Sequence, residues 1–190
     1  KPTILVMIDG RASSINYAKK YVPAILHAWF PGEFCGQAVA ETIFGDNNPG
    51  GRLAVTFPKS VGQIPFAFPF KPGSDSGCGT SVTGALFPFG HGLSYTQFAI
   101  SNLRSDKNLM NQNDSITFTV NVKNSGKRAG AETIQLYIHD VKASVDRPYK
   151  ELKGFQKVYL QPGESKDVNI TINKQALSFY DETAASWKAE

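Results

Sequence analysis

The sequence predicts a mostly β protein in which a short α/β segment precedes an immunoglobulin-like β-sandwich. The pattern of apolar residues changes near residue 96. Before that point, short continuous apolar runs alternate with a helical pattern, which is typical of an α/β layer structure. After it, apolar and polar residues alternate with a period of two between turn signals, which is typical of a sandwich.

The α/β segment opens with two apolar runs that predict strands buried on both faces. Thr3–Ile8 is continuous and apolar, and Asp9-Gly10 closes it with a turn signal. Ala24–Trp29 has the same character, and Ile15–Tyr21 between the two runs favours a short helix. Strands of this kind belong to parallel sheets that helices cover on both sides.

A second helix and a third strand follow. Gly36–Phe44 has helical spacing, and Gly45 suits the left-handed position that ends a helix. The apolar face of this helix is expected to carry Val39, Ala40, Ile43 and Phe44. After the turn residues 46–51, Leu53–Phe57 predicts a short strand, which completes a strand–helix–strand order.

Residues 58 to 96 are rich in Pro and Gly, so we expect no regular structure there. Aromatic side chains recur through the same stretch, which indicates that it lies packed on a surface. The alternating segments then predict half-buried strands around residues 116–122, 134–138 and 168–172.

Composition limits the possible functions. The chain has 190 residues, enough for one or two domains with a real core. Its net charge of +4 comes from scattered Lys and Arg without a nucleic-acid motif, so we expect no nucleic-acid binding. No apolar run approaches the roughly 20 residues that span a bilayer, so we expect no membrane span.

Two further features bear on the origin of the chain. It has two cysteines, Cys35 and Cys78, which we interpret as buried or free thiols, although a single bridge is possible in an oxidising compartment. The chain begins at Lys1 and runs directly into a predicted strand, as expected of a piece cut from a longer polypeptide.

Three blocks of the sequence, in order, resemble the C-terminal region of family 3 glycoside hydrolases, the β-glucosidase/β-xylosidase type. The first block is Trp29-Phe30-Pro31-Gly32-Glu33, Gln37–Asp46, Asn48–Leu53 and Thr56-Phe57-Pro58. The second is Phe87–Thr96 with Phe98. The third is Asn124-Ser125-Gly126, Gln135–Ile138, Arg147-Pro148, Lys150–Phe155, Leu160, Pro162-Gly163-Glu164 and Leu177–Asp181.

The resemblance implies a fibronectin type III-like β-sandwich preceded by the C-terminal half of an α/β sandwich domain. We place the half-domain at residues 1–70, a linker at 71–96 and the fibronectin-like sandwich at 97–190. Family members usually continue past the position of Trp187 into one more strand. Without such a strand, a sheet edge would be left unpaired.

The resemblance also implies a parent enzyme that removes single sugars from β-glucosides or β-xylosides with retention of configuration. Such chemistry needs two carboxyl groups roughly 5 Å apart. In the family, an Asp of an N-terminal barrel and a Glu upstream of the stretch matching Thr3–Asp9 supply them. We therefore expect no catalytic residue, cofactor or metal in this chain, and a fragment that is inactive and structural. Its partners would be the missing barrel and sandwich segments, and the parent would be periplasmic or extracellular.

Several residues invite a role of their own. Glu33 follows a predicted strand at an edge where open α/β sheets bind ligands, so it is a candidate substrate-binding residue, or else a carboxylate near a helix start. His91 lies between two glycines and is expected to pack or hydrogen-bond. Residues 46–48 lack the spacing of a calcium loop and predict a turn. A separate site of Asp140, Asp146 and Glu151 is the less favoured alternative to solvated loop charge.

The aromatic residues leave two interpretations open. They could stack on sugar rings, but packing between domains is favoured. The residues concerned are Phe66, Phe68, Phe70, Tyr95, Tyr149 and Tyr180. The alternative function is a non-catalytic carbohydrate-binding or domain-bracing module, which an exposed aromatic platform on one sheet would favour.

Overall fold

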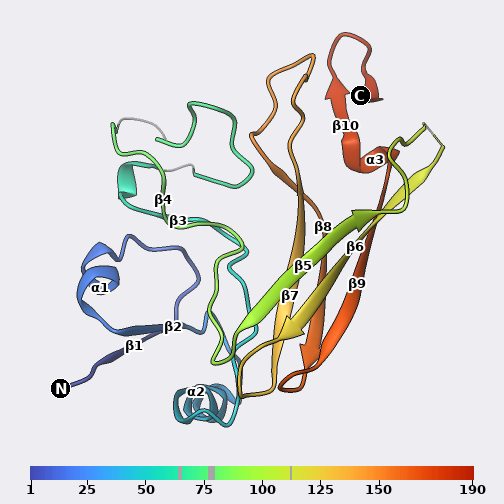
Figure 1. Ribbon diagram of the computed structural model, residues 1–190. Helices are drawn as coiled ribbons and strands as arrows, with labels where there is room; N and C mark the ends of the chain where they lie inside the picture. Colours follow the sequence, from blue (N-terminus) through green and yellow to red (C-terminus); the bar gives the residue numbers. More distant parts are fainter. Residues whose placement is uncertain (64–65, 77–79, 112) are drawn as a thin grey trace. The chain divides into compact units, whose positions relative to one another are not determined.

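The computed structural model describes residues 1–63, 66–76, 80–111 and 113–190, which form two compact units, residues 1–93 and 94–190 (Figure 1). Residues 71–93, predicted as a linker, belong to unit 1. Cys35 is half-buried at the start of a helix. Cys78 lies outside the described residues, so the interpretation of the two cysteines as buried or free thiols, with a single bridge as the alternative, stays a prediction.

Unit 1 begins with a parallel pair of strands joined by a helix. Strand β1 (Ile4–Met7) pairs with β2 (Ala24–His27), and α1 (Asn16–Tyr21) lies between them in the chain. Both predicted strands and the helix are confirmed. The predicted burial on both faces is wrong, because Ile4 is 48% exposed and the other β1 residues are only half-buried. The described residues form a sheet of only two strands here, so the side chains of β1 are not covered on both faces.

Helix α2 (Cys35–Phe44) also confirms its prediction, including its end. Gly45 adopts the left-handed conformation (φ 90°), and its N–H donates to the carbonyl of Glu41. The predicted apolar face is only partly right. Val39 and Ile43 are half-buried, but Phe44 is 82% exposed. The buried residue of the helix is Thr42, whose hydroxyl donates to the carbonyl of Ala38.

The Pro/Gly-rich stretch is more ordered than predicted. Strand β3 (Phe57–Pro58) pairs with β4 (Ala85–Phe87), and a 3₁₀ turn, η1 (Val61–Gln63), follows β3. The expectation of no regular structure is therefore wrong at these places. The strand predicted at Leu53–Phe57 is also wrong except at its last residue.

One buried side chain organises this stretch. Gln63 is fully buried, and its Oε1 accepts hydrogen bonds from the backbone N–H groups of Lys59 and Ser60. Its Nε2 donates to the carbonyls of Asp75 and Gly84. A single amide thus satisfies backbone groups from three separate segments, which replaces a longer strand ladder.

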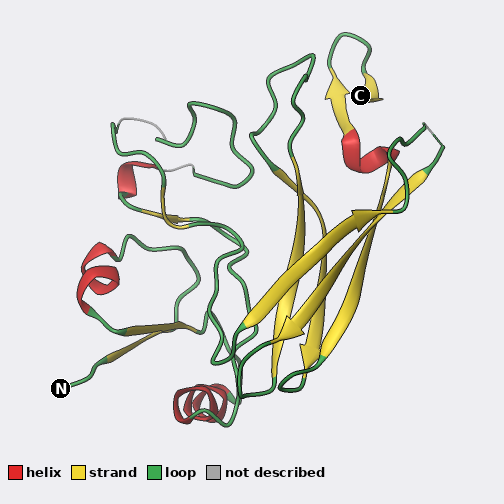
Figure 2. Ribbon diagram, in the orientation of Figure 1, coloured by secondary structure: helices red, strands yellow, loops and turns green. Residues whose placement is uncertain are grey.

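Unit 2 is a sandwich of antiparallel strands (Figures 1 and 2). One sheet has the order β5-β6-β9, and the other pairs β7 with β8. The strands are β5 (Phe98–Ser105), β6 (Ser115–Asn124), β7 (Gly130–Ile138), β8 (Glu151–Leu160) and β9 (Ser165–Asn173). The three alternating segments fall within β6, β7 and β9, which confirms those predictions.

A short helix and a hairpin complete unit 2. Helix α3 (Lys174–Leu177) leads into β10 (Ser178–Asp181), which pairs with β11 (Ser186–Ala189). A bulge interrupts the β7–β8 pairing. Leu136 faces Gly154 and Tyr137 faces Leu152, so Lys153 is the extra residue on β8.

The core of unit 2 comes from alternate strand positions that face one another. Its buried members are Val120, Val122, Ile134, Leu160, Val168 and Ile170. A polar residue, Asn124, is fully buried beside them. Its Oδ1 accepts from Thr96 (2.7 Å) and its Nδ2 donates to the carbonyls of Arg128 and Leu160. This side chain ties the end of β6 to the first residues of the unit.

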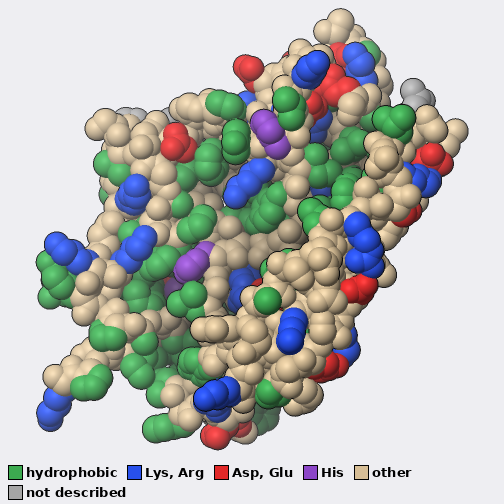
Figure 3. Space-filling view, viewed as in Figure 1, with side chains coloured by type: hydrophobic (Ala, Val, Ile, Leu, Met, Phe, Trp, Pro, Cys, Tyr) green, Lys and Arg blue, Asp and Glu red, His purple; other side chains and the backbone are tan. Residues whose placement is uncertain are grey.

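The sequence predicted scattered Lys and Arg and no membrane-spanning segment. Figure 3 shows Lys and Arg dispersed over the visible face rather than gathered in one patch. Among the described residues, none of the helices is both long and apolar enough to cross a bilayer.

Candidate functional site

The carboxyl ends of β1 and β2 bring two polar side chains together. Asp9 follows β1 closely, and His27 is the last residue of β2. The Nε2 atom of His27 lies 2.9 Å from Oδ1 of Asp9. The histidine side chain is only 8% exposed, and the aspartate is 33% exposed. This edge is where open α/β sheets place their ligands.

Aromatic rings enclose the histidine. Its ring centroid lies 4.0 Å from that of Trp29 and 5.2 Å from that of Phe57, both edge to face. Its second nitrogen, Nδ1, is buried without a hydrogen-bond partner in the described part of the chain. Buried polar atoms normally have partners. In the described part of the chain, the hydroxyls of Ser14 and Thr56 share this state with His27.

Trp29 has a strained backbone beside an open hollow. Its φ is +54°, which is rare for a bulky residue and is tolerated where the surroundings enforce it. Gly10 allows the chain to pass close by, because an added Cβ would lie 2.6 Å from the ring of Phe30. The hollow has a volume of about 290 Å³ and is lined by Gly10, Arg11, Ala12, Trp29, Ala54, Val55, Thr56, Pro58, Phe66, Ala67 and Phe68.

Glu33 lies in the turn between β2 and α2 and is exposed. It directly follows Gly32, which has a φ of +78°. Glu33 does not line the hollow beside Trp29. Its substrate-side role therefore stays a prediction.

His91 is held by packing and by its backbone, as predicted. Its ring stacks on Phe87 at 5.4 Å, and its carbonyl accepts from the N–H of Leu53. Burial lowers the pKa of His91 below its ordinary value, and the positive charges of Arg52 and Lys19 lower it further. The ring is thus biased toward its neutral form.

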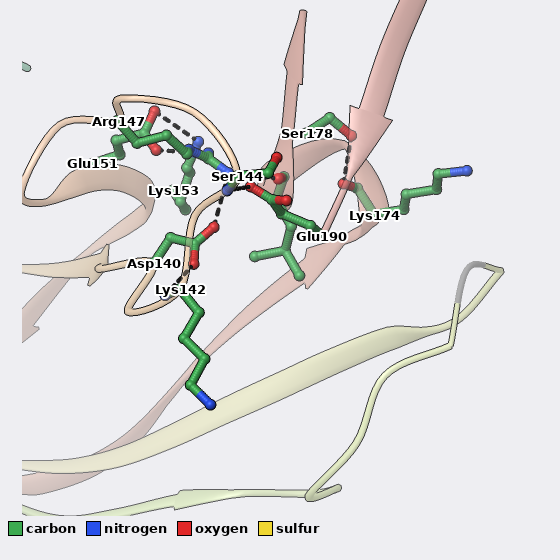
Figure 4. A network of polar contacts seen from close by, with 10 residues as sticks. Asp140, Lys142, Ser144, Arg147, Glu151, Lys153, Lys174, Ser178 and Glu190 are labelled. Carbon is green, nitrogen blue, oxygen red and sulfur yellow. Dashed lines mark hydrogen bonds and ion pairs between the residues drawn. The ribbon is translucent and has the colours of Figure 1, made fainter. Parts of the chain in front are cut away.

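Two carboxylates of the sandwich, Asp140 and Glu151, share one cation. Arg147 binds Asp140 at 3.4 Å and Glu151 at 2.7 Å, and its side chain is 8% exposed (Figure 4). Lys153 binds the other oxygen of Glu151 at 3.3 Å. Asp146 is exposed and is not part of this network. A guanidinium that both carboxylates bind suits a structural ion-pair network.

No group of three or more His, Cys, Asp or Glu side chains among the described residues is arranged to hold a metal ion. The predicted turn at residues 46–48 is observed as a turn after α2. The Nδ2 of Asn47 donates to the hydroxyl of Thr42 at 3.1 Å, so this side chain closes the helix end.

The aromatic candidates divide between packing and exposure. Phe68 stacks on Phe89 at 4.4 Å, and Phe66 contacts Phe70 at 5.2 Å, so they pack on one another. Phe66 and Phe68 also line the hollow beside Trp29. In unit 2, Tyr149 and Tyr180 are 67% and 52% exposed. The ring of Tyr95 lies 5.9 Å from the guanidinium of Arg128.

The Asp9–His27 pair was not predicted from the sequence, although a signal was available. Each residue lies at the carboxyl end of a run that was correctly predicted as a strand. Parallel pairing of those runs would have placed both side chains at one edge. The strain at Trp29 has no comparable signal, because nothing in an apolar run predicts a positive φ.

The comparisons with known proteins agree with one another. The profile of the glycosyl hydrolase family 3 C-terminal domain matches residues 1–95, and that of the fibronectin type III-like domain matches residues 132–190. The chain belongs to glycosyl hydrolase family 3.

The similar proteins are named as glycosidases. A periplasmic β-glucosidase of Salmonella typhimurium is 42% identical over 96% of this chain and 25% of its own length. A β-xylosidase of Formosa agariphila is 43% identical over 96% of this chain and 26% of its own. This chain thus spans about a quarter of these relatives.

Solved structures show the same fold. A β-glucosidase from Erythrobacter marinus is 40% identical, with a TM-score of 0.90 over 99% of this chain and 25% of that one. A β-glucosidase from Listeria innocua in complex with glucose is 34% identical, with a TM-score of 0.88 over all of this chain and 28% of that one. The predicted family and fold class, a fibronectin-like sandwich preceded by part of an α/β domain, are confirmed.

Proposed function

We propose that the chain is the C-terminal part of a retaining exo-β-glycosidase that hydrolyses β-glucosides or β-xylosides. The observation that carries the proposal is its identity of about two fifths, over almost its whole length, to proteins named β-glucosidase and β-xylosidase. The chain covers only a quarter of those proteins, so its own contribution is a part of the enzyme.

The chain alone is inactive and structural in this proposal. Retaining hydrolysis needs two carboxyl groups roughly 5 Å apart with a sugar between them. Asp140 and Glu151 both bind the guanidinium of Arg147, so each is engaged in an ion pair. The nucleophile and the acid/base would come from the barrel and sandwich segments that this chain lacks.

Unit 1 completes the α/β sandwich domain in this proposal. Several large apolar side chains of the unit are exposed, which suits surfaces that a further segment covers. They include Ile4, Ile8, Phe30, Phe34 and Phe44. The edge with Asp9 and His27 would then border the sugar site, and Glu33 would act on the substrate side.

A chimeric enzyme tests the proposal. Replacing the matching last quarter of the Salmonella β-glucosidase with residues 1–190 should give an enzyme that hydrolyses 4-nitrophenyl β-glucoside. The chain alone should show no hydrolysis of the glucoside or the xyloside above background. Ordinary turnover by the chain alone, or a folded chimera without activity, would contradict the proposal.

The role of Glu33 has its own test in the chimera. Glu33→Gln removes the charge and keeps the size, so a substrate-side carboxylate should raise KM by about threefold to tenfold with little change in kcat. Glu41→Gln is the control, because Glu41 lies within α2 and away from the turn that holds Glu33. Equal kinetic constants for both variants would show that Glu33 only supports the helix start.

The alternative function is a carbohydrate-binding or bracing module. An exposed aromatic residue in the hairpin of unit 2, Trp187, favours it. The parent is inferred to be periplasmic or extracellular, which the name of the Salmonella relative supports.

A further inference from the structure

Unit 2 contains a hollow that plays no part in the function proposed for unit 1. It has a volume of about 810 Å³, which is within the range of small-molecule sites. The loop before β6, the strands β8 and β9, helix α3 and the β10–β11 hairpin all contribute to it. It is lined by Asn113, Asp114, Glu151, Lys153, Asn173, Lys174, Gln175, Ser178 and Trp187.

Trp187 supplies an aromatic platform at this hollow. The side chain belongs to β11 and is 70% exposed. It lies opposite Tyr180 on β10, and the two rings meet edge to face with centroids 5.8 Å apart. This contact holds the indole by its neighbour while most of its surface stays open. A flat apolar ring with a polar surround is the surface on which the C–H face of a pyranose stacks.

The polar side of the hollow is held in place before any ligand arrives. Glu151 is fixed between Arg147 and Lys153 (Figure 4). Arg147 also donates to the carbonyl of Leu177, the last residue of α3. Fixed polar groups lose little entropy on binding, which raises affinity.

The end of β9 adds amide groups. The Oδ1 of Asn173 accepts from the N–H of Gln175 and caps α3. Within the described residues, the NH₂ group of that asparagine has no such bond and remains available to a ligand. The side chain of Gln175 adds both a donor and an acceptor.

The charges around the hollow select for a neutral ligand. Asp114 and Glu151 balance Lys153 and Lys174, so the lining has no net charge. A phosphate or a cation would therefore gain no overall attraction. A lining that holds both donors and acceptors beside an aromatic side chain suits an array of hydroxyl groups.

We propose that this hollow binds a β-linked oligosaccharide, with a sugar ring on Trp187 and its hydroxyls on Glu151, Lys153, Asn173 and Gln175. The choice of β-linked sugars rests on the proposed function, whereas the site rests on the geometry of unit 2. Binding here would hold a saccharide chain on the sandwich, apart from any catalytic step.

The test is to titrate the whole chain with cellohexaose and with xylohexaose and to measure the Kd of each by isothermal titration calorimetry. At least one should bind, and Trp187→Ala should weaken binding at least about tenfold. Phe155→Ala is the matched control, because Phe155 is 69% exposed on β8 and does not line the hollow. This control should leave the Kd unchanged.

A second variant covers the case in which Trp187→Ala loosens the hairpin. Gln175→Ala keeps the backbone N–H that binds Asn173 and should weaken binding about threefold at an unchanged Tm. Absence of binding by both oligosaccharides, or equal losses in the Trp187 and Phe155 variants, would overturn the proposal. An active chimera with a chain that binds no sugar would reject only this site. An inactive chimera with a chain that binds would reject only the proposed function.

Discussion

The two units of the chain bury their apolar residues very differently. In unit 2, alternate residues of four strands meet in one core, and Val122 and Leu160 are fully buried there. In unit 1, Phe57, Pro58 and Leu86 are the described apolar residues that are buried, while those of β1 and α2 are half-buried or exposed. Unit 2 has the core of an independent domain, whereas unit 1 has surfaces that suit a further layer.

The largest expected effect is in the core of unit 2. Leu160→Ala should lower the free energy of unfolding by about 2–5 kcal/mol, because it removes a fully buried side chain and leaves a cavity. Ile4→Ala in β1 should lower it by less than about 1 kcal/mol, because that side chain is 48% exposed. Thermal unfolding followed by circular dichroism measures both. Similar losses would remove the contrast between the units.

A polar core residue should give the next largest effect. Asn124→Ala should lower the free energy of unfolding by about 1–3 kcal/mol, because it leaves the carbonyl of Leu160 and the hydroxyl of Thr96 buried without this partner. Asn121→Ala is the control, since that side chain forms its bonds at an exposed position on the same strand. If the two variants unfold alike, the buried network contributes little to unit 2.

Substitution of Gln63 should affect unit 1 and leave unit 2 unchanged. Gln63→Leu keeps the volume but removes four hydrogen bonds to the backbone. We expect amide hydrogen exchange at Lys59 and Ser60 to accelerate by about tenfold or more, because their acceptor is lost. Exchange in the core strands of unit 2 should not change. Uniform acceleration in both units would mean that they unfold together.

The smallest effect should come from pH. Because the folded-state pKa of His91 is lowered, the unfolded chain binds a proton more readily. Stability should therefore fall as the pH drops through the ordinary value of 6.5 toward the folded-state pKa, and it should not depend on this group above that window. His91→Gln should flatten the dependence of Tm on pH in this range. An unchanged slope would assign the pH dependence to other groups.

The parts that the sequence predicted are those with regular local patterns. Strands β6, β7 and β9 follow from period-two alternation, and α2 follows from helical spacing and Gly45. Strand β3 could not be predicted, because two residues carry no period and their partner, β4, lies far along the chain. The role of Gln63 depends on four distant backbone groups, so no local pattern reveals it.

The candidate site was also predictable only where a local sequence pattern indicates it. Asp9 and His27 are 18 positions apart, and only parallel pairing of β1 and β2 brings them together. Glu33 was predicted to lie at the edge because it sits in a turn that follows a predicted strand. Its position outside the hollow depends on the turn at Gly32, which the sequence indicates but does not orient.

The bulge in β8 has a consequence for how the hollow of unit 2 tolerates change. Side chains alternate between the two faces of a strand, and the extra residue at Lys153 resets this alternation midway. Deleting that single residue would leave Leu152 opposite Tyr137 and Glu151 opposite Ile138, in a ladder without the local bend and twist of the bulge. The faces of Glu151 and Leu152 would not change, so the bulge adds one lining side chain, Lys153, without altering the pairing of its neighbours.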